Sequence, residues 1–116
     1  MLSLENRLKK RKSFAYIHKN GRRSHAGILS LSVVGANVRD VKIGFSVSKK
    51  IGNSVVRHTV TRRMRVAARE VLPQIKPKQT IIFTAREGIE GVHLNDIRKA
   101  MLLSLKKAGL LKDGGA

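Results

Sequence analysis

Cysteine is absent from this sequence of 116 residues, and acidic residues, aromatic residues and long apolar runs are scarce. Without cysteine the chain cannot form disulfides, thiolate nucleophiles or cysteine-based zinc sites. The four histidines lack the spacing of metal ligands, and the seven acidic residues are too dispersed to form a carboxylate cluster for catalytic metal ions. No apolar run approaches the roughly 18 residues that a membrane-spanning helix needs. The N-terminus lacks the apolar core of a signal peptide, so no signal peptide is expected.

Basic residues dominate what is present. Lys and Arg number 25 against 7 Asp and Glu, which gives a formal net charge of +18. A compact chain tolerates such a charge best against a polyanion, and nucleic acid is the commonest one, with an anionic membrane surface as the weaker alternative. A hydrophobic content of 41% supports a modest core, whereas 3% aromatic residues disfavour a protein that grips single strands mainly by stacking. The length predicts one domain over residues 1–116, with an ordered core of about 7–109 and flexible termini. Its charge predicts that it binds nucleic acid, and we expect an RNA-binding domain.

The spacing of apolar residues predicts a single α+β domain with the element order αββαβα. The clearest strand is Val41–Ser48, in which apolar residues alternate with small or polar ones. Its second face carries Lys42, Gly44, Ser46 and Ser48 and is nearly flat. An extra short strand at Lys49-Lys50 would bring the predicted sheet from three strands to four. The other predicted elements are a helix at Lys10–Lys19 ended by Asn20-Gly21, a strand at Ile28–Val34, a connection at Gly35–Asp40, a helix at Ser54–Leu72, a strand at Thr80–Thr84 and a helix at His93–Ala108.

The strongest functional signal is one face of the predicted helix Ser54–Leu72. At about 100° per residue, basic side chains lie opposite the apolar stripe. On a helix face that is merely solvated, glutamates four residues from such cations are expected, because like charges at that spacing destabilise a helix. Here the first acid after Lys49 is Glu70. The pattern therefore favours phosphate contact, for which the arginine fork is suited. The stripe holds Val56, Val60, Met64, Ala67 and Val71, the basic face holds His58, Arg62, Arg65 and Arg69, and the flanks hold Arg57 and Arg63.

The loop Ser48–Ser54 precedes this helix and carries Lys49 and Lys50. It lacks the G-x-x-x-x-G-K-[ST] pattern, so nucleotide hydrolysis is not supported. A helix N-terminus flanked by two lysines can bind a backbone phosphate, and a simple structural cap is the alternative. The residues alone thus indicate a nucleic-acid-binding domain. A ribosomal protein and a DNA-compacting protein remain open, while the missing carboxylate cluster argues against a free nuclease.

The segment Gly44–Arg57 resembles the bacterial ribonuclease P protein subunit. It reads G-F-S-V-S-K-K-I-G-N-S-V-V-R, where the family typically reads G-F-S-V-S-K-K-I-G-N-A-V-V-R and continues with N-R-x-K-R-x-x-R. Arg7-Leu8, Phe14 and Gly21-Arg22-Arg23 are similar to the family's opening, and the resemblance extends from Arg7 to Leu105. The chain departs from the family at His58 and Thr59 in place of Asn and Arg, at Thr61 in place of Lys, and at His18 in place of a second aromatic residue.

The resemblance implies a small basic cofactor of a catalytic RNA in the cytoplasm. Protein and RNA together would remove the 5′ leader of precursor tRNA by hydrolysis and leave a 5′ phosphate on the mature tRNA. The RNA subunit would hold the catalytic Mg²⁺, so no catalytic residue, metal site, organic cofactor, small-molecule substrate or membrane contact is expected in the protein. The implied fold has a sheet of about four strands and a left-handed βαβ crossover, as in the second domain of a ribosomal protein.

The resemblance and the basic pattern together predict two sites. The RNA-subunit site would comprise Lys49, Lys50, Arg57, His58, Arg62, Arg65 and Arg69. The leader site would lie between the first helix and the sheet, with Phe14 as a ring for stacking a base. Its predicted residues are Phe14, Tyr16, Lys42, Ser46 and Ser48. Tyr16 need not share the helical angle of Phe14, and Phe14 could instead anchor the first helix to the core.

Overall fold

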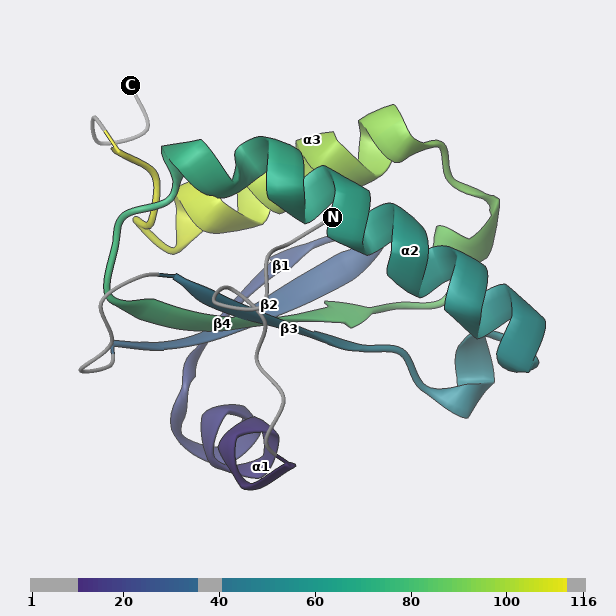
Figure 1. Ribbon diagram of the computed structural model, residues 1–116, viewed down its shortest axis with the longest axis horizontal. Helices are drawn as coiled ribbons and strands as arrows, with labels where there is room; N and C mark the ends of the chain where they lie inside the picture. Colours follow the sequence, from purple (N-terminus) through teal and green to yellow (C-terminus); the bar gives the residue numbers. More distant parts are fainter. Residues whose placement is uncertain (1–10, 36–40, 113–116) are drawn as a thin grey trace.

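Three helices and a four-stranded sheet make up the computed structural model, which describes residues 11–35 and 41–112. The sheet forms the middle layer, with two helices on one face and the first helix on the other (Figure 1). The predicted helix start at Lys10, the pair Arg7-Leu8 and most of the connection Gly35–Asp40 lie outside the described residues. The elements are α1 (Arg11–Asn20), β1 (Arg22–Ala26), β2 (Leu29–Gly35), β3 (Lys42–Ser46), η2 (Lys49–Ile51), α2 (Ser54–Val71), η3 (Leu72–Gln74), β4 (Gln79–Ala85), η4 (Ile89–Gly91) and α3 (Leu94–Lys107).

The strands lie in the order β1-β2-β4-β3. β2 pairs antiparallel with both β1 and β4, whereas β3 pairs parallel with β4. A parallel pair needs a long crossover connection, and α2 supplies it between β3 and β4. The structure therefore confirms the predicted α+β class, with a mixed sheet packed by helices.

The main core lies between the sheet and the pair α2 and α3. Leu31, Phe83 and Phe45 are neighbours in register on β2, β4 and β3, and the two phenylalanine rings stack with centroids 6.3 Å apart. Met64 of α2 and Met101 of α3 are fully buried in the same core. Because side chains alternate along a strand, Lys42, Gly44 and Ser46 face the opposite side, toward α1.

α1 is fastened to that opposite face by close backbone contacts. Ile17 is only 2% exposed and points toward the sheet, where Ile82 is also buried. The chain then turns at Gly21, where a Cβ atom would lie 2.5 Å from the carbonyl oxygen of Ile17 and 3.0 Å from that of Val33. Nη2 of Arg23 donates to the carbonyl oxygen of His18 at 2.9 Å and so satisfies one of the last carbonyls of α1. Glycine at position 21 thus determines how closely α1 approaches β2.

Two expectations about strands were wrong. The fourth strand is β1, which the sequence analysis missed because RRSHA shows no alternation of large apolar residues; its inward positions are only Ser24 and Ala26. Lys49-Lys50 is part of the 3-10 helix η2, since the backbone N–H of Ile51 donates to the carbonyl oxygen of Ser48 at 3.1 Å and closes a tight turn. The predicted strand Val41–Ser48 is correspondingly shorter, as β3 ends at Ser46.

No helix among the described ranges is long and apolar enough to cross a membrane.

Candidate nucleic-acid interface

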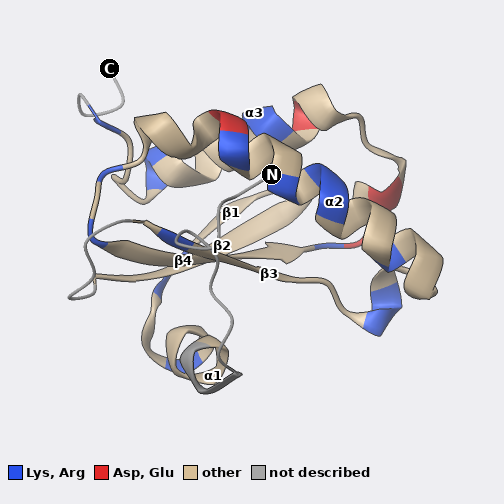
Figure 2. Ribbon diagram, viewed as in Figure 1, with Lys and Arg blue, Asp and Glu red and all other residues tan. Residues whose placement is uncertain are grey.

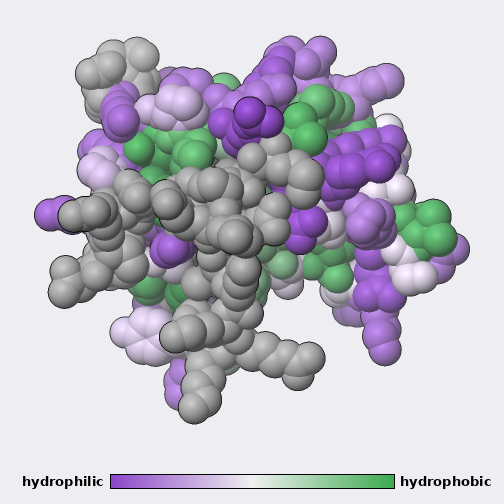
Figure 3. Space-filling model, in the orientation of Figure 1, coloured by the Kyte–Doolittle hydropathy of each residue, from purple (hydrophilic) through white to green (hydrophobic). Residues whose placement is uncertain are grey.

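The outer side of α2 carries a row of cations, as predicted. The helix begins after Asn53, whose Oδ1 accepts a hydrogen bond from the backbone N–H of Val56 at 3.0 Å, and it buries Val60, Met64, Ala67, Ala68 and Val71. The side chains that point away from this stripe are half-buried or exposed, and Figure 2 shows blue segments recurring along α2 and at η2. Hydrophilic side chains also predominate over α2 in the space-filling view (Figure 3). We call His58, Arg62, Arg65 and Arg69 the α2 basic face.

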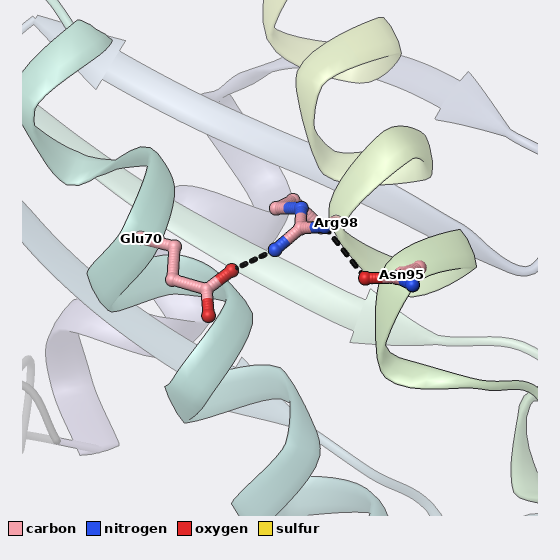
Figure 4. Close-up of polar contacts among 3 residues, drawn as sticks. All are labelled: Glu70, Asn95 and Arg98. Carbon is pink, nitrogen blue, oxygen red and sulfur yellow. Dashed lines mark hydrogen bonds and ion pairs between the residues drawn. The ribbon is translucent and has the colours of Figure 1, made fainter.

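The acid at the end of α2 does not neutralise this face. Glu70 forms an ion pair with Arg98 of α3, and Nη2 of Arg98 also donates to Oδ1 of Asn95 at 2.6 Å (Figure 4). Glu70 therefore lies on the side of α2 that packs against α3, where its charge is matched by that of Arg98. The α2 basic face keeps its positive charge toward solvent.

Arg57 and Arg63 occupy opposite flanks of the apolar stripe, as predicted, and differ in their partners. Nη1 of Arg63 donates to the carbonyl oxygens of Glu90 at 3.3 Å and Val92 at 3.5 Å, so this guanidinium fastens η4 to α2. Arg57 lies about 120° away from Arg63 around the helix axis and is half-buried. Its Nε is buried and has no hydrogen-bond partner. A buried donor without an acceptor is costly.

Thr59 and Thr61 occupy two positions where the family typically carries cations. Oγ1 of Thr59 donates to the carbonyl oxygen of Val55 at 3.1 Å, and Oγ1 of Thr61 donates to that of Arg57 at 2.8 Å. Both hydroxyls are thus engaged by the helix backbone. These positions add no charge, and the positive charge of α2 is restricted to the basic face and its two flanking arginines.

η2 places a second group of cations beside the start of α2. Lys49 and Lys50 are exposed, and Lys50 lines a shallow hollow of about 370 Å³ between η2, the end of β4 and the β1–β2 turn. The side chain of Asn53 supplies the N-terminal cap of α2. Arg86, which the sequence analysis did not single out, lies across the hollow. It lies two residues after the predicted strand Thr80–Thr84, which was the available signal, but only the parallel pairing of β3 with β4 brings it near Lys50.

The predicted leader site is brought together only in part. Lys42 and Ser46 of β3 share the face of the sheet that α1 covers, and half-buried Phe14 lies on α1 one turn before His18. Ser48 is exposed just beyond the end of β3. Tyr16 is 60% exposed and lies about 200° from Phe14 around α1, so the structure does not bring the two rings together.

Comparison with known proteins identifies the group to which this geometry corresponds. The family model described as Ribonuclease P matches residues 2–109. A ribonuclease P protein component from Alkaliphilus metalliredigens is 36% identical over 106 residues, which cover 91% of this chain and 96% of that protein. Another from Clostridium botulinum strain 657 is 34% identical over 107 residues, covering 91% and 96%.

Solved structures with the same fold include two ribonuclease P proteins. That of Staphylococcus aureus at 2.0 angstrom has a TM-score of 0.82 and 26% identity, and the match covers 92% of this chain and 98% of that one. The ribonuclease P protein of Thermotoga maritima has a TM-score of 0.79 at 22% identity over 87% and 96% of the two chains, a likeness of fold alone.

Proposed function

Because this chain belongs to the ribonuclease P protein family, we propose that it binds the catalytic RNA subunit and the 5′ leader of precursor tRNA, and so promotes removal of the leader. The α2 basic face carries this proposal. His58, Arg62 and Arg69 are exposed and Arg65 is half-buried, and the one acid of α2 pairs with Arg98. Such a surface attracts phosphates irrespective of base sequence. The residues assigned to the RNA subunit are Lys49, Lys50, Arg57, His58, Arg62, Arg65 and Arg69.

The leader would lie on the other side of the sheet, beside α1. Ser46 is small and half-buried, so a single strand can approach this end of β3, and Phe14 offers a half-buried ring on α1. Lys42 supplies a cation on the same face. With Ser48 and Tyr16 at the margins, this is the surface that would distinguish precursor tRNA, which has a leader, from mature tRNA, which has none.

Under this proposal the protein binds and positions, and the RNA subunit carries the chemistry. Water attacks the phosphodiester bond between leader and tRNA, the leader departs with a 3′ hydroxyl, and the tRNA keeps the 5′ phosphate. We assign the Mg²⁺ ions to the RNA subunit; across residues 11–35 and 41–112, no three His, Asp or Glu side chains gather where they could hold a metal ion. We also infer that the protein acts in the cytoplasm, where bacterial precursor tRNA is made.

The deciding experiment is cleavage of precursor tRNA by the ribonuclease P RNA from the same genome at low Mg²⁺. Adding the protein should raise the cleavage rate, and the protein alone should cleave nothing. A ribosomal protein would bind structured RNA without raising the rate, and a DNA-compacting protein would bind duplex DNA equally well in competition. Either outcome would contradict the proposal.

A further inference from the structure

Three lysines lie together at the end of the molecule where α2 ends. The backbone N–H of Lys76 donates to the carbonyl oxygen of Leu110 at 2.8 Å, and Ile75 forms an antiparallel bridge with Leu111. The segment after η3 and the segment after α3 therefore run side by side, and both show blue at this end of the ribbon (Figure 2). Lys76, Lys78 and Lys112 are all exposed. We call these three residues the lysine corner.

Lys78 has an unusual backbone conformation. Its φ is 65°, and it is the one residue other than glycine with a positive φ in the part of the chain that the structure describes. It follows Pro77, and proline followed by a positive φ is the pattern of a type II turn, in which the second position is normally Gly or Asn. Lysine is strained in this conformation, whereas glycine is not. The turn alone therefore does not explain lysine here, and what lysine adds is a charge.

Asp113 follows Lys112 directly, but no acid lies beside Lys76 or Lys78 in sequence. No Asp or Glu occurs at positions 71–86 or 97–112, and Glu70, just before the first of these stretches, is paired with Arg98. η3 leads directly from the last turn of α2, where Arg69 is exposed, to the corner. The lysine corner thus continues the α2 basic face beyond the C-terminal end of an 18-residue helix that is about 27 Å long.

We propose that the lysine corner is a second phosphate-binding surface for the RNA subunit. This inference rests on the proposed function, because it extends the contact made by the α2 basic face. Lysines suit such a role, since a compact ammonium group attracts backbone phosphates without reading bases. The contact should therefore be insensitive to local RNA sequence and sensitive to salt.

The test compares variants of the full chain in binding to the ribonuclease P RNA transcribed from the same genome, over a series of salt concentrations. Lys78→Gly relieves the backbone strain, so its melting temperature should not fall. The double variant Lys76→Ala/Lys78→Gly should have a log–log salt slope shallower by about 1.4 to 1.8 and bind roughly ten-fold more weakly near 0.1 M salt. Lys78→Arg keeps the charge and should keep the wild-type slope.

The matched control is Lys99→Ala on the exposed side of α3, which removes one charge outside the corner. The inference is overturned if the double variant matches this control in slope and affinity, if Lys78→Arg loses as much as Lys78→Gly, or if the loss appears only when the assembled complex binds precursor tRNA. Arg62→Ala, measured in parallel, distinguishes failure of the lysine corner from failure of the proposed α2 interface. If it weakens RNA binding while the double variant does not, only the lysine corner fails; if neither has an effect, the α2 interface fails too.

Discussion

Replacing Arg57 by methionine should stabilise the isolated protein and weaken its binding to RNA. Arg57 is half-buried, and its Nε is buried without an acceptor. Leaving a buried donor unsatisfied costs about 1–3 kcal/mol. Because the side chain is only partly buried, we take the lower end, about 1 kcal/mol, which corresponds to a rise in melting temperature of about 4 °C for a small domain. Methionine keeps much of the packing of the side chain without the charge.

The effect on RNA binding has the opposite sign. If a phosphate of the RNA subunit satisfies the guanidinium, its loss removes hydrogen bonds to a charged group worth about 1.5–3 kcal/mol, or roughly 10- to 150-fold in Kd. Thermal denaturation and RNA titration of the same preparations measure both quantities, and Arg62→Met, at an exposed position, should lose affinity with an unchanged melting temperature. A melting temperature several degrees lower for Arg57→Met would refute the reasoning, since the guanidinium would then stabilise the fold.

Further predictions concern the two surfaces. RNA affinity should fall with salt at a log–log slope of about −4 or steeper, at roughly 0.7 to 0.9 per phosphate contact; a slope near −1 would remove the basic face from the interface. Arg62→Ala and Arg65→Ala should each weaken assembly with the RNA subunit by about 1–3 kcal/mol, and an equal loss of thermal stability would instead make them structural. Phe14→Ala should reduce the affinity of the assembled complex for precursor tRNA by about 1–3 kcal/mol and spare mature tRNA, whereas equal losses would point to a core role. Gly21→Ala forces a Cβ against backbone and should lower stability by about 1–3 kcal/mol, with leader discrimination lost as α1 shifts; an unchanged melting curve would contradict the close contact.

The elements that were predicted well are those in which the spacing of apolar residues shows which face is buried. The apolar spacing of α2 and α3 and the alternation of β3 directly reflect which residues are buried, and these elements lie where they were expected. β1 was missed because an edge strand beside α3 needs only Ser24 and Ala26 inward, and Oγ of Ser24 donates to the carbonyl oxygen of Ser104 at 2.9 Å. Short strands of this kind are defined by a distant partner, which local sequence does not reveal.

The candidate site, too, could be predicted from the sequence only in part. The α2 basic face follows from helical periodicity alone, so the amino-acid sequence is sufficient to place Arg62, Arg65 and Arg69 on it. The distinction between Arg57 and Arg63 could not be predicted, because it depends on which flank packs against η4. Lys50 and Arg86 are remote in sequence, and the order of the strands brings them to one hollow. Lys76 and Lys112 are also remote in sequence, and the bridge between Ile75 and Leu111 brings their segments together.

The strand order has a consequence for how the chain is completed during synthesis. β4 is an inner strand that pairs with both β2 and β3, yet it is the last strand to be made. At about 5–20 residues per second, the ribosome needs roughly 2 to 7 s after the end of β3 to reach the start of β4. During that interval β3 has no neighbour and the apolar stripe of α2 has no complete sheet to cover. A chain that stops before Gln79 would therefore carry most of the basic surface without the strand that organises it, and we expect such fragments to remain unfolded.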